Sequence, residues 1–144
     1  MKLLILNGPN LNRLDLREKN YYGDLNYEEI SAAINTRAEQ LGFEVDMRQS
    51  NDESEIIEWL HQAADLKLPV IFNPAAFTHY SYAIRDAVVM LKAPCIEVHL
   101  SNPLSREEFR HTSVISGVVN GTIAGFGVNS YLLAMDAMLQ LLKD

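Results

Sequence analysis

Short apolar runs are spaced along the chain and are separated by longer stretches with helical periodicity. The first run, residues 3–6, ends at the turn sequence Asn7-Gly8-Pro9-Asn10. Residues 43–48 alternate between apolar and polar side chains, which is typical of a half-exposed edge strand. The pattern predicts three further strands, at residues 69–72, 95–100 and 122–127, the last of these including its exit turn.

Amphipathic segments between these runs predict helices. The first helix begins near Asn26, because Glu29 follows three residues later as in a capping box. Gly42 suits the position just after the end of that helix. Ser50 is expected to open the second helix, with Glu53 in its first turn. Two more helices are expected, one over residues 84–91 and one from about residue 129.

Strands that alternate with helices indicate an α/β fold with a parallel sheet covered by helices on both faces. Five strands fit the doubly wound, flavodoxin-like order, and we interpret residues 1–144 as one domain. In such sheets ligands bind beyond the carboxyl ends of the strands. This rule selects the segments to inspect, which are residues 7–23, 73–81 and 99–110.

Composition narrows the classes of partner. The 144 residues carry a formal net charge of −7, which argues against a nucleic-acid or membrane-surface partner, although local positive charge could still bind a small anion. Cys95, the single cysteine, lies in an apolar run and is interpreted as a core residue. No apolar stretch is long enough to span a bilayer and no signal-peptide pattern opens the chain, so we expect a cytoplasmic protein.

Most of the unusual polar residues fall in the three selected segments. Each has a simple structural alternative: residues 7–10 could be only a turn, Arg17 and Arg110 could be solvated charges, and His79 could cap a helix. Their concentration at one sheet edge nevertheless predicts a site. Its candidate residues are Asn10, Arg17, Tyr22, Asn73, His79, His99, Ser101 and Arg110.

Glu97 and His99 form the most specific pair. They lie two positions apart in a predicted buried strand, which places both side chains on one face. A carboxylate beside an imidazole fixes its tautomer and favours its protonated form, as a general acid requires. The alternative is a purely structural ion pair.

Several familiar motifs are absent from the sequence. There is no G-x-G-x-x-G after the first strand, no phosphate-binding P-loop and no G-x-S-x-G elbow. The four histidines lack metal-ligand spacing, and no lysine lies in an apolar strand where it could form an imine. The chemistry left open is metal-free acid–base catalysis on a small polar anion.

A series of sequence blocks gives the chain a specific resemblance. In order along nearly the whole chain, these blocks are Asn7-Gly8-Pro9-Asn10-Leu11-Asn12, Arg17-Glu18 with Tyr22-Gly23, Asn73-Pro74 with Thr78-His79, residues 83–87, Ile96-Glu97-Val98-His99-Leu100-Ser101-Asn102, Arg106-Glu107-Glu108-Phe109-Arg110-His111, and Gly125-Phe126-Gly127. Together they resemble the type II 3-dehydroquinate dehydratases. The resemblance implies a flavodoxin-like subunit, a homo-oligomer (a dodecamer built from trimers) and no cofactor. The implied reaction is dehydration of 3-dehydroquinate to 3-dehydroshikimate, in the shikimate pathway or in quinate catabolism.

The resemblance also implies residue roles. Tyr22, which precedes the glycine, is the expected base, and Arg17 is expected to activate it. His99, oriented by Glu97, is the expected acid that protonates the departing hydroxyl. The remaining implied residues are Asn10, which helps to hold a water against the enolate oxygen; Asn73, His79, Leu100, Ser101 and Arg110, which line the substrate site; and Asp86, which reaches a neighbouring subunit's site.

The chain departs from the family pattern at a few positions. Asp15 stands where glycine is common, Lys19 where proline is common, and residues 75–77 read Ala-Ala-Phe in place of Gly-Ala-Tyr. Residues 13–24 are predicted to be a loop that closes over the substrate, the alternative being an ordinary flexible loop. Two other functions stay open at this point: a non-catalytic anion-binding protein, and a lyase for a related cyclic hydroxy acid.

Overall fold

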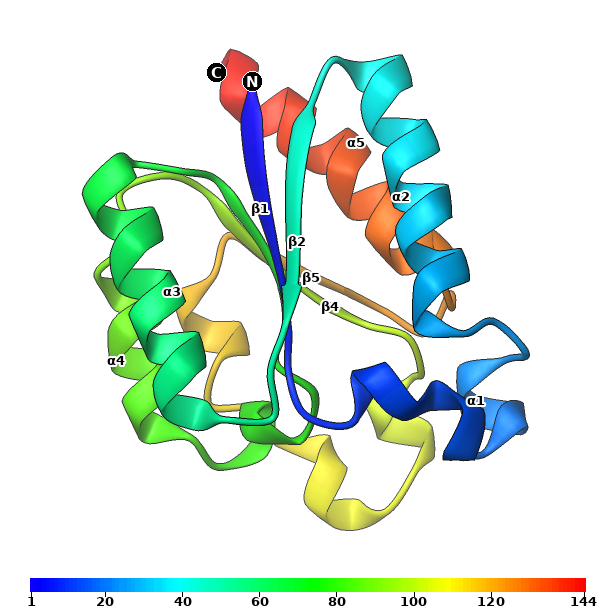
Figure 1. Ribbon diagram of the computed structural model, residues 1–144. Helices are drawn as coiled ribbons and strands as arrows, with labels where there is room; N and C mark the ends of the chain where they lie inside the picture. Colours follow the sequence, from blue (N-terminus) through cyan, green and yellow to red (C-terminus); the bar gives the residue numbers. More distant parts are fainter.

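Five parallel strands form one sheet at the centre of the computed structural model, which describes residues 1–144 (Figure 1). The strand order is β2-β1-β3-β4-β5, which confirms the flavodoxin-like topology. As predicted, the alternating strand β2 lies at one edge. The strands are β1 (Lys2–Asn7), β2 (Glu44–Gln49), β3 (Val70–Asn73), β4 (Cys95–His99) and β5 (Gly121–Ala124).

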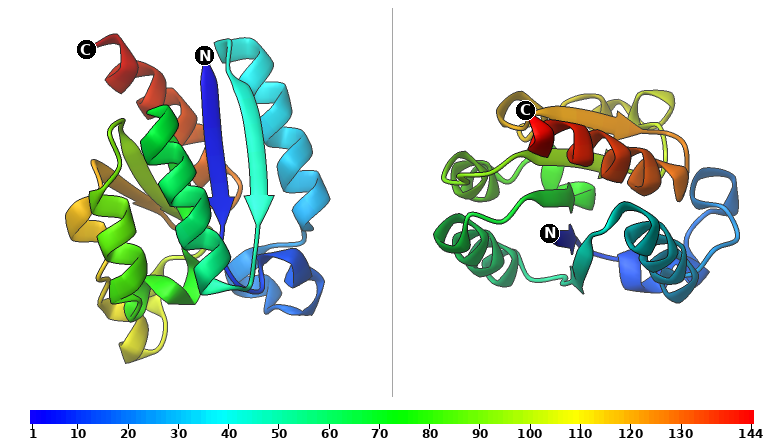
Figure 2. Two further views of the ribbon diagram at one scale, coloured as in Figure 1. Left: turned by 60° about the vertical axis from the view of Figure 1, so that its left-hand side comes forward. Right: turned by 90° about the horizontal axis from the view of Figure 1, so that it is seen from above.

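Helices cover both faces of the sheet (Figure 2). Helices α2 (Tyr27–Leu41) and α5 (Asn129–Lys143) pack together on one face, while α3 (Glu53–Leu66) and α4 (Tyr82–Val89) pack on the other. Side chains alternate along β1, so that Leu3 and Ile5 enter one hydrophobic core and Leu4 and Leu6 enter the other. None of these helices combines the length and the apolar character needed to cross a membrane.

Local hydrogen bonds explain where the helices begin. Asn26 caps α2 through its Oδ1, which accepts from the Glu29 amide at 2.8 Å, as the capping pattern predicts. The prediction that Ser50 opens the second helix is wrong by two residues. Asp52 is the cap, because its carboxylate accepts from the Ser54 amide at 2.9 Å, whereas the Ser50 hydroxyl accepts from the amide of Asp52 itself.

The polar stretch after β1 is more ordered than its sequence suggests. It forms the 3-10 helix η1 (Leu11–Leu16) and the short helix α1 (Lys19–Tyr22). Leu11, Leu14 and Tyr22 are buried in the hydrophobic core beside α2, and these contacts hold the segment against the body of the protein. Four further 3-10 turns complete the fold: η2 (Ala75–His79), η3 (Pro103–Ser105), η4 (Glu108–His111) and η5 (Ser116–Val118).

The turns that follow β1 and β3 are pressed together at Gly8. The Gly8 amide donates to the Asn73 carbonyl at 2.7 Å. A Cβ atom at this position would lie 2.4 Å from the Pro74 carbonyl oxygen, which is closer than van der Waals contact allows. Glycine therefore lets two segments that carry candidate site residues approach each other.

We expect Gly8→Ala to lower the free energy of unfolding by roughly 1–3 kcal/mol, because the backbone at Pro74 has to move. Chemical denaturation monitored by circular dichroism measures this loss. Gly117→Ala is the matched control, since a Cβ atom there meets nothing within 4 Å. Equal stabilities for the two variants would contradict the close-approach explanation.

Candidate active site

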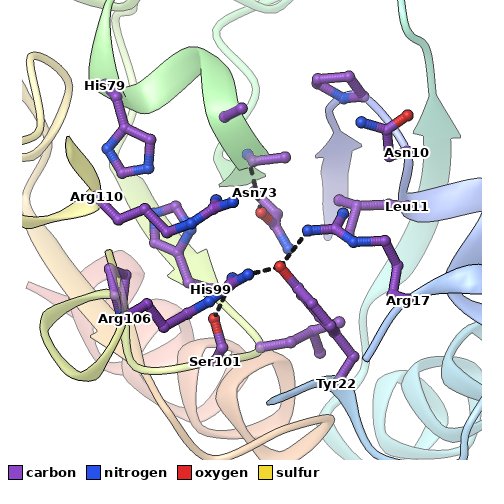
Figure 3. A pocket seen from close by; sticks show the side chains of 15 residues that line it. Asn10, Leu11, Arg17, Tyr22, Asn73, His79, His99, Ser101, Arg106 and Arg110 are labelled. Atoms are coloured by element: carbon purple, nitrogen blue, oxygen red, sulfur yellow. Dashed lines mark hydrogen bonds between the residues drawn. The ribbon is translucent and has the colours of Figure 1, made fainter. Parts of the chain in front are cut away.

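A positively charged pocket opens at the carboxyl ends of β1, β3 and β4 (Figure 3). Three arginines and two histidines line it, and no aspartate or glutamate does. Such a lining favours an anionic ligand. The lining residues are Pro9, Asn10, Leu11, Arg17, Tyr22, Asn73, Ala75, Ala76, His79, His99, Leu100, Ser101, Pro103, Arg106 and Arg110.

The phenol oxygen of Tyr22 lies between two guanidinium groups. It accepts hydrogen bonds from Nη2 of Arg17 and from Nη1 of Arg106 (Figure 3). The Arg17 guanidinium carbon also lies 4.2 Å from the centre of the Tyr22 ring. Two permanently charged donors thus converge on one oxygen, and the side chain is shielded because Tyr22 is only 9% exposed.

The local backbone explains how Arg17 reaches Tyr22. Arg17 is extended at the end of η1, and a single turn of helix, α1, begins at Lys19. That turn stops at Gly23, whose φ of +74° suits glycine. The five-residue separation therefore carries the chain back on itself, so that the two side chains meet.

Arg106 is the residue that sequence reasoning missed. It belongs to a sequence block that carries the family resemblance. It lies among other charged residues, however, and nothing in this pattern indicates a functional role for it. Asn102 caps η3 and Pro103 begins it, and this turn brings Arg106 back over Ser101, to which its Nη1 donates at 3.2 Å. Its side chain is only 5% exposed, and its Nε is buried without a hydrogen-bond partner.

The Glu97–His99 pair has the predicted geometry. Nε2 of His99 lies 2.6 Å from Oε2 of Glu97, and Glu97 is fully buried. The carboxylate also accepts from three hydroxyl groups, those of Thr78 at 2.5 Å, Thr122 at 3.3 Å and Ser116. Burial alone would raise the pKa of Glu97, but the hydrogen bond and charge of His99, with the hydroxyls of Ser116 and Thr78, outweigh burial and lower the pKa. An ionised Glu97 makes Nε2 of His99 a donor and leaves Nδ1 free for proton transfer.

His79 lines the pocket and does not cap α4. Its Nδ1 lies 2.8 Å from the Thr112 carbonyl, and the N-cap of α4 is Ser81, whose hydroxyl accepts from the Ile84 amide. The helix-cap alternative for His79 is therefore wrong. Burial lowers the pKa of His79, which favours its neutral form.

Most of the other candidates also meet at this pocket. Asn10 reaches it from a left-handed turn with φ +70°, and Arg110 reaches it while its Nε donates to Glu107 at 3.2 Å. Asn73, Leu100 and Ser101 are buried lining residues. Asp86 is the exception, because it lies on an exposed position of α4 outside the pocket.

Comparison with known proteins places the chain in a family. A model of the family described as Dehydroquinase class II matches residues 1–139. The 3-dehydroquinate dehydratase of Caldicellulosiruptor bescii is 51% identical over 142 residues, which are 98% of this chain and 98% of that protein. The chain belongs to the dehydroquinase class II family.

Further relatives are similar to this chain over nearly its whole length. The 3-dehydroquinate dehydratase of Pelotomaculum thermopropionicum is 52% identical over 141 residues, covering 98% of both chains. The crystal structure of type II dehydroquinase from Propionibacterium acnes matches with a TM-score of 0.94 at 49% identity and covers 96% of both chains. A 3-dehydroquinate dehydratase-like protein from Bifidobacterium longum matches with a TM-score of 0.77 at 39% identity, over 100% of this chain and 99% of that one.

The buried Glu97 predicts a specific dependence of stability on pH. Because its pKa is lowered in the folded protein, it stabilises the fold above its ordinary value of 4.5, and this contribution is lost as the pH falls through the folded value. We expect the unfolding free energies of wild type and Glu97→Gln to converge as the pH falls below 4.5.

Urea unfolding at several pH values measures this convergence. Glu44→Gln, at an exposed position of β2, is the control and should follow the wild-type profile. Parallel profiles for wild type and Glu97→Gln would show that the buried carboxylate has no such role.

Proposed function

We propose that this chain catalyses the dehydration of 3-dehydroquinate to 3-dehydroshikimate. The observation that carries the proposal is the Tyr22 oxygen held by Arg17 and Arg106 in a pocket without acidic lining residues. Membership of the dehydroquinase class II family and the printed names of the relatives support the choice of substrate.

Tyr22 is the proposed base. The substrate has a hydrogen on the carbon next to its ketone and a hydroxyl leaving group one carbon further on. A free tyrosine has a pKa of about 10, so a phenolate base at neutral pH needs stabilisation on the order of 4 kcal/mol. The charges of Arg17 and Arg106 act on the phenol oxygen directly, and the Tyr22 side chain is buried. Tyr22 then removes the hydrogen and leaves an enolate.

His99 is the proposed acid for the second half of the reaction. As the enolate collapses, the bond to the hydroxyl group breaks, and His99 supplies the proton that turns the departing hydroxide into water. Glu97 holds the imidazole by its Nε2 and compensates its positive charge. Asn10, at the rim of the pocket, is proposed to hold a water against the enolate oxygen.

The other proposed roles concern binding and closure. Asn73, His79 and Arg110, with Leu100 and Ser101, are proposed to contact the substrate. Residues 13–24 carry both Arg17 and Tyr22, so movement of this segment would dismantle the base, and we propose that it opens for substrate entry. We propose that the observed arrangement, with Tyr22 buried, is the closed form of this segment.

We also propose that the chain forms a homo-oligomer, a dodecamer built from trimers, in which Asp86 reaches a neighbour's site. The exposed position of Asp86 outside its own pocket supports this, as do the exposed apolar side chains of Tyr82 and Val89 on the same helix. A cytoplasmic location stays a prediction.

Turnover of 3-dehydroquinate by the purified protein tests the proposed function. The product is a conjugated enone, so its formation appears as a rise in ultraviolet absorbance. We expect turnover to survive both EDTA and treatment with borohydride in the presence of substrate, because no step uses a metal or an imine. Absence of turnover would refute the function, and inactivation by borohydride only with substrate present would point to a lysine imine.

The assignment of Tyr22 is tested by replacing each of two adjacent tyrosines. We expect Tyr22→Phe to lower kcat roughly 10²- to 10⁴-fold, because the base is lost while the ring remains. Tyr21→Phe is the matched control, since the Tyr21 ring stacks on Arg106 at 4.5 Å and its hydroxyl has no proposed role. Steady-state kinetics on both variants decide the point, and near-wild-type turnover by Tyr22→Phe would remove it from the mechanism.

A further inference from the structure

We propose that Tyr131, on helix α5, is a positioning residue that fixes the side-chain amide of Asn73 so that it presents an N–H donor to the bound substrate. This inference rests on the proposed function and adds to it a residue outside the pocket. It concerns which atom of Asn73 faces the ligand, and therefore which kind of ligand atom Asn73 recognises.

The Tyr131 hydroxyl joins the ends of two strands beneath the pocket. Tyr131 is only 1% exposed, and its ring lies in the core between α5 and the sheet. Its hydroxyl donates to Oδ1 of Asn7, at the end of β1, at 2.5 Å. It accepts from Nδ2 of Asn73, at the end of β3, at 2.8 Å. One hydroxyl thus links the two strands whose following turns meet at Gly8.

The direction of each hydrogen bond in this network is fixed by its neighbours. The Arg48 carbonyl can only accept, so the atom of Asn7 that lies 3.2 Å from it must be Nδ2. Oδ1 of Asn7 therefore faces Tyr131 and takes its single hydroxyl hydrogen. Tyr131 has only an acceptor left for Asn73, and Nδ2 of Asn73 supplies the donor.

The amide oxygen of Asn73, Oδ1, also has a fixed hydrogen-bond partner. The Ala75 amide can only donate, and it donates to Oδ1 of Asn73 at 3.1 Å. Ala75 has a φ of +52°, in the left-handed region that favours glycine, so this bond helps to hold a strained turn. Two independent partners, Tyr131 and Ala75, thus select the same orientation of the Asn73 amide.

The fixed orientation of the Asn73 amide gives the pocket an N–H hydrogen-bond donor. Nδ2 carries two hydrogens, of which Tyr131 takes one, and Figure 3 shows the Asn73 side chain between Arg17 and Arg110 in the pocket. The second hydrogen is free to meet an oxygen atom of the substrate. Burial also raises the pKa of Tyr131, so that its hydroxyl stays neutral and keeps the hydrogen on which the network depends.

Tyr131→Phe tests the proposal because it removes the hydroxyl and keeps the ring. Without that oxygen the Asn73 amide loses its fixed partner, and Oδ1 of Asn7 is left unpaired. We expect KM for 3-dehydroquinate to rise roughly tenfold, the usual effect of one lost hydrogen bond, with a smaller change in kcat. The donor acts on bound substrate throughout the reaction, so its loss appears mainly in KM.

Two further variants distinguish a positioning role of Tyr131 from a general contribution of α5 side chains to stability. Ser130→Ala removes another fully buried hydroxyl from the same helix, one that accepts from the Phe126 amide at 3.1 Å and does not touch Asn73. We expect it to lower thermal stability with KM unchanged. In an Asn73→Ala background, Tyr131→Phe should have no further effect on KM, because the group through which it acts is absent.

A readout that does not need turnover comes from the side-chain amide of Asn73, assigned in ¹H–¹⁵N spectra by its absence in Asn73→Ala. Its hydrogens should exchange with solvent faster in Tyr131→Phe than in wild type. The proposal is overturned if Tyr131→Phe leaves KM and amide exchange unchanged, if Ser130→Ala raises KM equally, or if the effects of Tyr131→Phe and Asn73→Ala are additive. Failure of the wild type to turn over 3-dehydroquinate would refute the function instead, and amide exchange would still decide the role of Tyr131.

Discussion

The contact between one phenol oxygen and two guanidinium groups is the interaction on which the rest of the site depends. Arg17 and Arg106 come from segments far apart in the chain, and both donate to Tyr22. Like charges repel, so the fold must hold the two cations together, and it does so with short turns anchored in the core. Leu11 and Leu14 anchor the turn before Arg17, and Pro103 begins the turn before Arg106.

The sheet holds the other part of the site, the Glu97–His99 pair, in a fixed position. The β4 strand holds a fully buried carboxylate, Glu97, and the cost of burying it is offset by His99 and three hydroxyls. The proposed base thus lies on the segment of residues 13–24, which we propose opens for the substrate, while the proposed acid lies on the sheet. This division suits a reaction in which the site must open for the ligand yet keep its proton donor in place.

Much of the fold follows from the sequence because its signals are local. The alternation of residues 43–48 predicts the edge strand, and Asn26 with Gly42 gives both ends of α2. The helix α3 begins two residues after the predicted Ser50, because Asp52 and not Ser50 makes the capping bond. Period two likewise places Glu97 beside His99, a prediction that needs no tertiary contact.

The features that escaped prediction depend on contacts between distant segments. Arg106 meets Tyr22 across 84 residues, and no spacing rule connects them. Tyr131 is 58 residues from Asn73 and reads in the sequence as one more apolar position of the last helix. The expectation that Asp86 reaches a neighbouring subunit comes from the family resemblance alone, because no local signal in the sequence indicates it.

The central claim, that Tyr22 removes the substrate hydrogen before His99 expels the hydroxyl, is tested most directly by hydrogen exchange in deuterated water. Incorporation of deuterium at the carbon next to the ketone of 3-dehydroquinate reports the first step, and enone formation reports the second. The account predicts that His99→Ala still exchanges this hydrogen while forming little product, and that Tyr22→Phe does neither. Exchange at the wild-type rate by Tyr22→Phe would contradict it.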